Sequence, residues 1–167
     1  MVGNTVPEAW MPRLASAIVG AVREFGARRL RREPVVAFAL GCFPWHGTIE
    51  LSVLTADELD ADPVLLEPGE LAAWHHYNFA VGLSAWEPEL GRLMSEGYRA
   101  SGDADRAATV AAFLRACAAA VASPEVAAAL ASLERDPRFT IGVAHPDDGR
   151  EFYPPGREAG VPPGVVT

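Results

Sequence analysis

The sequence predicts an α+β fold, with a central antiparallel β-sheet of four to five strands and helices packed mainly on one face of the sheet. Two strand-like runs, at residues 35–40 and 48–54, flank a connection bracketed by two glycines and containing a proline. Alanine-rich segments with helical spacing of their apolar residues fill much of the remaining chain. A length of 167 residues suits a single domain. We place this domain at residues 1–153 and a Pro- and Gly-rich tail at 154–167.

The hairpin over residues 35–54 is the predicted platform of the fold. Residues 35–40 are apolar on both faces, which is typical of a central strand covered from both sides. In residues 48–54 apolar and polar side chains alternate, so this strand is expected to bury one face and to turn the other towards solvent. The expected solvent-facing side is formed by Thr48, Glu50 and Ser52.

Helices are expected on both sides of the hairpin in the chain. Before it, an amphipathic helix is predicted up to about Leu30, starting near Pro12 or at a capping-box pattern over residues 5–8. Directly after it, Thr55 and Glu58 form a second capping-box pattern, which opens a short helix to about Ala61. Further helices with an apolar stripe and an N-terminal cap or first-turn proline are predicted at residues 86–98, 103–122 and 123–135.

Three further short strands complete the predicted sheet. Residues 77–81 follow one or two helical turns at 70–75 and are apolar enough for a strand. In residues 139–144 large apolar side chains alternate with small or polar ones. A turn pattern at 147–149 then predicts that residues 151–153 return as an edge strand beside it.

The charge and the absence of certain patterns restrict the function. A formal net charge of −8 argues against a nucleic-acid partner, because binding without sequence preference depends on neutralising phosphates, and it suits a basic protein partner. No apolar stretch approaches the roughly 20 residues that span a bilayer, so no membrane partner is expected. Because no signal-peptide pattern is present, we expect a cytoplasmic protein. Cys42 and Cys117 are then expected to be reduced and buried. We expect a monomer or a homodimer.

Aromatic side chains and three histidines gather in the middle of the chain. Aromatic residues dominate binding hot spots in protein interfaces, but the same residues could form a minor core between a sheet edge and a helix. On the first of these interpretations, acidic side chains would assist a contact surface at the hairpin tip and the following aromatic segment. That predicted surface consists of Trp45, His46, Trp74, His75, His76, Tyr77, Trp86 and Glu87.

An enzyme or a metal-binding protein is the alternative, and it would use His46, His75 and His76. Imidazole is a common ligand for transition metals, but the usual spacings of paired histidine ligands are absent. The sequence also has no nucleophile elbow and no glycine-rich phosphate loop. We therefore predict no catalytic residue, no metal ligand and no cofactor.

The order of the elements provides a family resemblance. A long helix, a hairpin, the Thr55–Glu58 pattern, an aromatic stretch from Tyr77 to Trp86, helices and a late strand with an acidic turn follow one another over roughly residues 10–153. This order resembles the bacterial DUF4303 family, a domain of unknown function. The resemblance implies an α+β domain with an antiparallel sheet and assigns no catalytic residue. The resemblance is compatible with an immunity-type protein, which neutralises a basic toxin by covering it. We expect a non-enzymatic protein-binding module.

Overall fold

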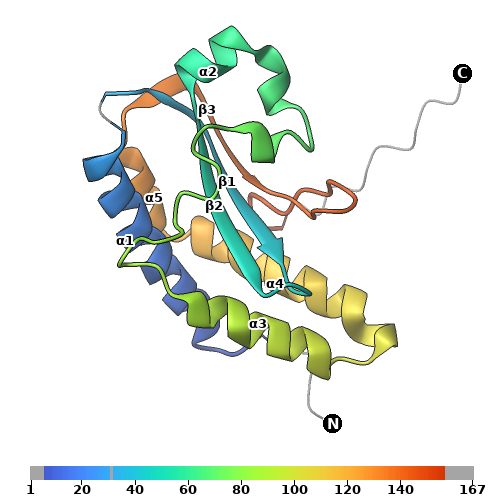
Figure 1. Ribbon diagram of the computed structural model, residues 1–167. Helices are drawn as coiled ribbons and strands as arrows, with labels where there is room; N and C mark the ends of the chain where they lie inside the picture. Colours follow the sequence, from blue (N-terminus) through green and yellow to red (C-terminus); the bar gives the residue numbers. More distant parts are fainter. Residues whose placement is uncertain (1–5, 31, 157–167) are drawn as a thin grey trace, which may run out of the picture.

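Along the chain, a β-hairpin follows one long helix and precedes the remaining helical elements, as the sequence predicts (Figure 1). The computed structural model describes residues 6–30 and 32–156. Strand β1 (Val35–Phe43) pairs antiparallel with β2 (Thr48–Thr55) along nearly its whole length. β1 is the middle strand of the sheet and is almost entirely buried. The predicted hairpin and the central position of its first strand are therefore confirmed.

The predicted antiparallel sheet of four to five strands is wrong. The described residues form a sheet of three strands in the order β2-β1-β3, and it is mixed, because β3 (Arg135–Val143) runs parallel to β1. The amide of Val35 donates a hydrogen bond of 2.8 Å to the carbonyl of Glu134, so β3 enters the sheet where β1 begins. A parallel neighbour requires a long crossover connection, and the helices between β2 and β3 supply it.

Residues 77–81 do not form the predicted strand. A single bridge joins His76 to Val53 at the outer edge of β2, and the amide of Phe79 donates to the carbonyl of Leu51 at 2.8 Å. Between these contacts Asn78 has a φ of 46°, in the left-handed region that asparagine tolerates better than most residues. The extended path therefore ends there, and the segment covers the edge of β2 without becoming a fourth strand.

Residues 151–153 likewise stop short of a strand. Glu151 forms an isolated bridge with Ala144, and the amide of Phe152 donates to the carbonyl of Val143 at 2.8 Å. Pro154 follows two residues later and has no N–H with which to extend a ladder. The predicted tail at 154–167 lies largely outside the described residues, as does Thr5 of the first capping-box pattern.

Four longer helices cover one face of the sheet (Figure 1). They are α1 (Trp10–Arg28), α3 (Pro88–Ala100), α4 (Arg106–Val121) and α5 (Pro124–Ala131). Their apolar stripes meet the side of β1 that carries Phe38 in one continuous core. Within it the rings of Trp10 and Phe113 pack edge to face with centroids 5.1 Å apart. Cys42 and Cys117 are free and fully buried in the same core.

The helices largely follow the sequence prediction, with one shortened element. The helix predicted at 123–135 ends at Ala131, because the chain turns there to begin β3. No single helix in the described part of the chain is long and apolar enough to cross a membrane. The segments Asp103–Val121 and Pro124–Ala131 meet that test only when taken together, and they are bent by 58° at their junction.

Among the described residues, the opposite face of the sheet carries only short elements. They are α2 (Ala56–Ala61) and the 3₁₀ helices η1 (Pro63–Leu66) and η2 (Leu71–Ala73). The capping box predicted at Thr55 and Glu58 is present and opens α2. Leu59 and Trp74 pack with Leu54 of β2 and with part of β1 in a second, smaller cluster. This side of the sheet is consequently covered only in part.

The turn of the hairpin rests directly on the backbone of α3. A Cβ placed on Gly91 would lie 2.0 Å from the carbonyl oxygen of Gly47, which is impossible without movement of one of the two elements. Gly47 itself has a φ of 68°, which an L-residue adopts only under strain. The pair of glycines thus sets how closely the hairpin approaches the helical layer.

Replacing Gly91 with alanine is therefore expected to lower the free energy of unfolding by about 2 kcal/mol, the scale of an overpacked contact. Gly97 in the same helix is the matched control, because a Cβ there would meet Phe113 at an ordinary 3.4 Å. G97A should raise stability by up to about 0.8 kcal/mol, since alanine is the better helix former. Urea denaturation of both variants tests this. A G91A protein as stable as G97A would contradict the contact.

Candidate functional site

A groove lies over the partly covered face of the sheet. Its volume is about 780 Å³. Small residues form its floor, namely Ala37, Ala39 and Gly41 of β1 and Gly142 of β3. They share one side of the sheet, because side chains alternate along a strand and Ala39 pairs with Gly142. No large side chain projects from these positions to fill the space above the sheet.

The walls of the groove combine apolar and acidic side chains. One wall comes from the segment after α2 and includes Leu66, Glu67 and Trp74. The facing wall comes from the loop after β3 and includes Asp147 and Asp148. Among the described residues that line the groove there is neither a lysine nor an arginine. The lining therefore presents a negative field to anything that enters.

Glu50 of β2 is the most unusual residue of the lining. It is only 9% exposed, and its Oε2 accepts a hydrogen bond of 2.6 Å from the hydroxyl of Tyr77. No basic side chain of the described residues pairs with this carboxylate. Glutamate is almost never buried to this degree unless it is paired with an opposite charge.

The burial of Glu50 overturns an expectation from the alternating pattern of β2. Thr48 is half-buried, but Glu50 and Ser52 do not face solvent as predicted. The segment after η2 folds across this side of the strand, and the amide of Asn78 donates to Ser52 Oγ at 3.0 Å. The polar residues of β2 thus serve as hydrogen-bond partners of the covering segment.

Tyr77 is held in its neutral form by this environment. Desolvation, the hydrogen bond to Glu50 and the negative charge of Glu50 together raise the pKa of Tyr77 to about 12. The residue is nevertheless 37% exposed, so part of its ring forms the accessible wall of the groove. Tyr77 therefore links the buried carboxylate to the surface.

Polar contacts fix the segment that carries Tyr77. The indole of Trp74 donates to the carbonyl of Leu65 at 2.7 Å, and the amide of His75 donates to Glu58 Oε1 at 2.6 Å. The other oxygen of Glu58 accepts from the amide and hydroxyl of Thr55 in the capping box. Desolvation opposes ionisation of Glu58, but these hydrogen bonds outweigh it and lower its pKa.

Of the eight residues predicted for a contact surface, only Trp74 and Tyr77 line the groove. His75 and His76 lie at the edge of β2, with their rings 4.7 Å apart. The ring of His76 contacts the carboxylate of Glu33 at 3.3 Å and packs edge-on against a buried phenylalanine of α1. The two histidines are therefore neighbours of the groove outside its lining.

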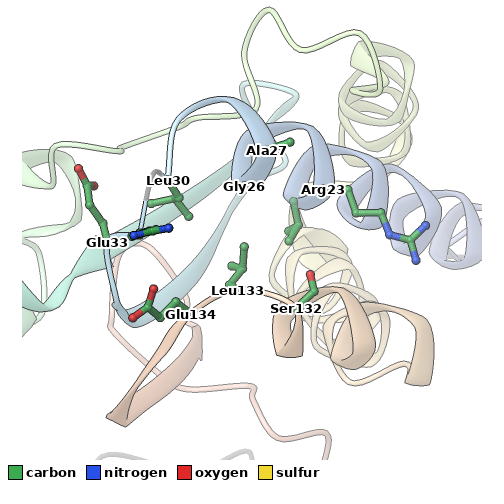
Figure 2. A pocket seen from close by; sticks show the side chains of 10 residues that line it. Arg23, Gly26, Ala27, Leu30, Glu33, Ser132, Leu133 and Glu134 are labelled. Carbon is green, nitrogen blue, oxygen red and sulfur yellow. The ribbon is translucent and has the colours of Figure 1, made fainter.

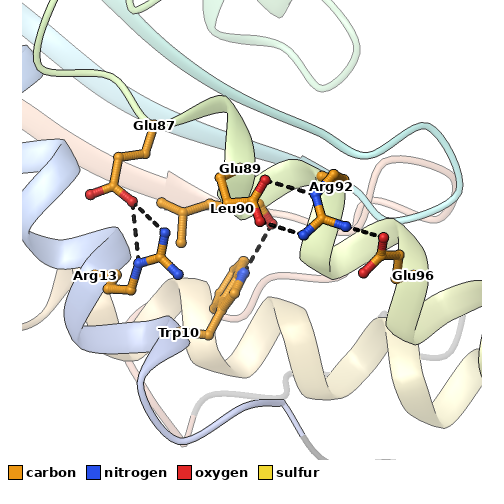
Figure 3. A network of polar contacts seen from close by, with 7 residues as sticks. All are labelled: Trp10, Arg13, Glu87, Glu89, Leu90, Arg92 and Glu96. Carbon is orange, nitrogen blue, oxygen red and sulfur yellow. Dashed lines mark hydrogen bonds and ion pairs between the residues drawn. The ribbon is translucent and has the colours of Figure 1, made fainter.

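The other four predicted residues lie elsewhere. At the hairpin tip His46 is exposed, while Trp45 is half-buried against Tyr98 of α3, with ring centroids 6.3 Å apart. Just before α3, Trp86 packs against the main core. Glu87 accepts two hydrogen bonds from Arg13 of α1, at 2.8 and 3.2 Å, in the network of Figure 3. The structure therefore does not gather the eight residues into one surface.

The three histidines do not form a metal centre. Within residues 6–30 and 32–156, no group of three or more His, Cys, Asp or Glu side chains is arranged to hold a metal ion. His46 lies at the tip of the hairpin, whereas His76 bridges to Val53 near the opposite end of β2, with His75 beside it. The alternative based on these histidines gains no support from their arrangement.

A second pocket is smaller and electrically balanced. It has a volume of about 320 Å³ and lies between the C-terminal ends of α1 and α5 (Figure 2). Two arginines and two glutamates line it, and all four are exposed. Its two positive and two negative side chains balance one another without any ligand. We therefore place the candidate site in the larger groove.

The residues that sequence reasoning missed share a physical feature. Glu50 occupies a position in β2 that alternation assigns to solvent, and the acidic turn after β3 gives only a turn signal. Their role emerges because Tyr77, 27 residues after Glu50, folds over the strand. A buried position can be recognised from the sequence only if the covering segment is known.

Comparisons with protein-family models, with curated proteins and with solved structures find no match to this chain. The resemblance to the DUF4303 family stays a prediction.

The Glu50–Tyr77 contact predicts an alkaline titration. Tyr77 should remain mostly protonated at about pH 11, so Y77F should lose little tyrosinate absorbance at that pH. E50Q keeps the shape of the side chain at position 50 but removes its negative charge, so the tyrosinate absorbance at about pH 11 should be higher than in the parent protein. Because the folded-state pKa is raised, the stability linked to this phenol is present up to about pH 10 and is lost as the pH rises towards 12. Unchanged absorbance in a folded E50Q protein would contradict the contact.

Proposed function

We propose that this protein is a non-enzymatic binding module that captures a basic protein partner in the groove. The observation that carries the proposal is the lining: acidic side chains and aromatic walls surround a floor of small residues, with no basic side chain among the described lining residues. A negative groove raises the local concentration of a positive partner and speeds its capture. The net charge of −8 acts in the same direction over longer distances.

The apolar part of the lining favours a protein partner. Leu66 and Tyr77 are 45% and 37% exposed, although both are large enough to be buried in a core. Both line the groove beside Trp74. Tyrosine and tryptophan are enriched in the residues that contribute most to protein interfaces. Acidic residues around this apolar strip would act as the polar rim that such interfaces usually have.

An immunity-type protein is the specific form that we propose. A protein of this type neutralises a toxin by covering it, and many toxins that act on nucleic acids are basic. An acidic groove with aromatic walls suits that task, because opposite charges accelerate association while buried aromatic contacts slow dissociation. This form of the proposal depends on the charge of the partner and on no catalytic group of this chain.

Decalysine is a suitable probe of the groove. We expect the folded protein to bind decalysine, to ignore decaglutamate, and to bind more weakly as salt is raised. The double variant E67K/D147K reverses two exposed charges of the lining and should weaken decalysine binding by about tenfold or more, measured by isothermal titration calorimetry at low salt.

The control is E8K/E125K, which makes the same change in net charge at exposed positions outside the groove. It should lose only the small part of the affinity that comes from overall charge. An equal loss in the two double variants would mean that decalysine responds to net charge alone, and the groove would then have no part in binding.

A further inference from the structure

We propose that the groove receives one long basic side chain of the partner, a lysine or an arginine, whose charged head is bound by Glu50 at the floor. This inference rests on the proposed function and specifies what the groove recognises.

The carboxylate of Glu50 has unused acceptor capacity. An ionised carboxylate offers about four lone-pair sites, and here the Tyr77 hydroxyl is its one donor among the described residues. The residue is 9% exposed, and its Oε1 is not fully enclosed by protein atoms, so this oxygen remains accessible. A buried negative charge without a cation is costly, and a cation that arrives with a partner would remove that cost.

No neighbouring cation of the described residues fills this role. Arg150 lies closest in sequence to the groove loop, but it pairs with Asp148 and its guanidinium lies over the ring of Phe152. His145 lines the groove, and its Nδ1 accepts a hydrogen bond from the amide of Asp147. The remaining charges of the wall are acidic, so the groove adds to the field of Glu50.

Arg138 is the other candidate cation, because it lies on β3. Its guanidinium is already bound to Asp136 on the same strand and to Asp60 of α2, at 2.8 and 2.9 Å. It does not line the groove. The contact with Asp60 connects β3 to α2 across this face of the sheet, so Arg138 has a structural role.

The floor leaves a path to Glu50. A Cβ placed on Gly41 would lie 3.5 Å from Glu50 Oε2 and 3.0 Å from the ring of Phe43. Glycine at this position therefore keeps the carboxylate open from the side of β1. A lysine or arginine could lay its apolar stem along the small residues of the floor, beside Trp74 and Tyr77. The aromatic faces would also attract its charge.

The experiment uses small mimics of the two side chains on the full chain. We would titrate n-butylammonium and n-butylguanidinium, with n-butanol as the neutral control, and follow amide and indole NMR signals. Both cations should shift the signals of Gly41, Gly142 and the Trp74 indole in a saturable way, and butanol should not. E50Q should weaken both cations by about tenfold or more, because the counter-charge is lost. E67Q, which removes a lining charge at the rim, should change the affinity by less than about threefold.

G41A provides a second variant that leaves every charge in place. Its added methyl group narrows the approach to Glu50 and should weaken the cations, whereas the alkaline titration of Tyr77 should stay as in the parent protein. If E50Q does not fold, G41A decides the question. Cation affinities that are unchanged in folded E50Q or in G41A would overturn the inference.

The two proposals fail in different ways. If E67K/D147K weakens decalysine binding but E50Q leaves the affinity for n-butylammonium unchanged, the groove binds basic partners without Glu50, and the present inference is wrong. If E50Q weakens binding of the small cations but E67K/D147K leaves decalysine binding unchanged, Glu50 binds a small amine and the proposed function is wrong. If no variant weakens the binding of decalysine or of the small cations, both proposals are wrong.

Discussion

The central strand of this protein must be covered on two sides, and the chain covers them unequally. β1 is apolar on both faces, and burial of that surface is the main stabilising contribution available to the sheet. Four helices cover one face with large side chains, whereas the other receives a short helix and two 3₁₀ helices. On that second side the strand presents Ala37, Ala39 and Gly41, which leave little apolar area to bury. The groove follows from this asymmetry.

The segment over the second face is held as much by polar contacts as by apolar packing. Glu58 binds the amide of His75, Ser52 binds the amide of Asn78, and Trp74 binds the carbonyl of Leu65. The contacts at Ser52 and Trp74 satisfy part-buried groups that would otherwise have no partner, whereas the contact at Glu58 lies at the surface. The contact between Glu50 and Tyr77 differs, because a neutral hydroxyl does not compensate a carboxylate charge. A stabilising role alone does not account for that residue.

Local patterns predicted local structure well here. The Thr55–Glu58 capping box and the amphipathic helices depend on residues within a few positions of one another, and the hairpin depends on two strands joined by a short turn. The direction of β3 could not be predicted in the same way, since an alternating strand fits a parallel or an antiparallel neighbour equally well. The site was harder still. Alternation placed Glu50 in solvent, and only the left-handed turn at Asn78 and the fold of the preceding segment bury it.

The central claim is that the carboxylate of Glu50, largely buried at the floor of an open groove and without a cation beside it, binds the cation of a partner. The most direct measurement is a crystal structure of the protein grown with n-butylguanidinium. The account predicts the guanidinium beside the carboxylate of Glu50, with its butyl chain over Ala39 and Gly41 and next to Trp74, and with Tyr77 still bound to Glu50. A groove filled by the protein's own side chains, or a Glu50 paired with an arginine of this chain, would contradict it.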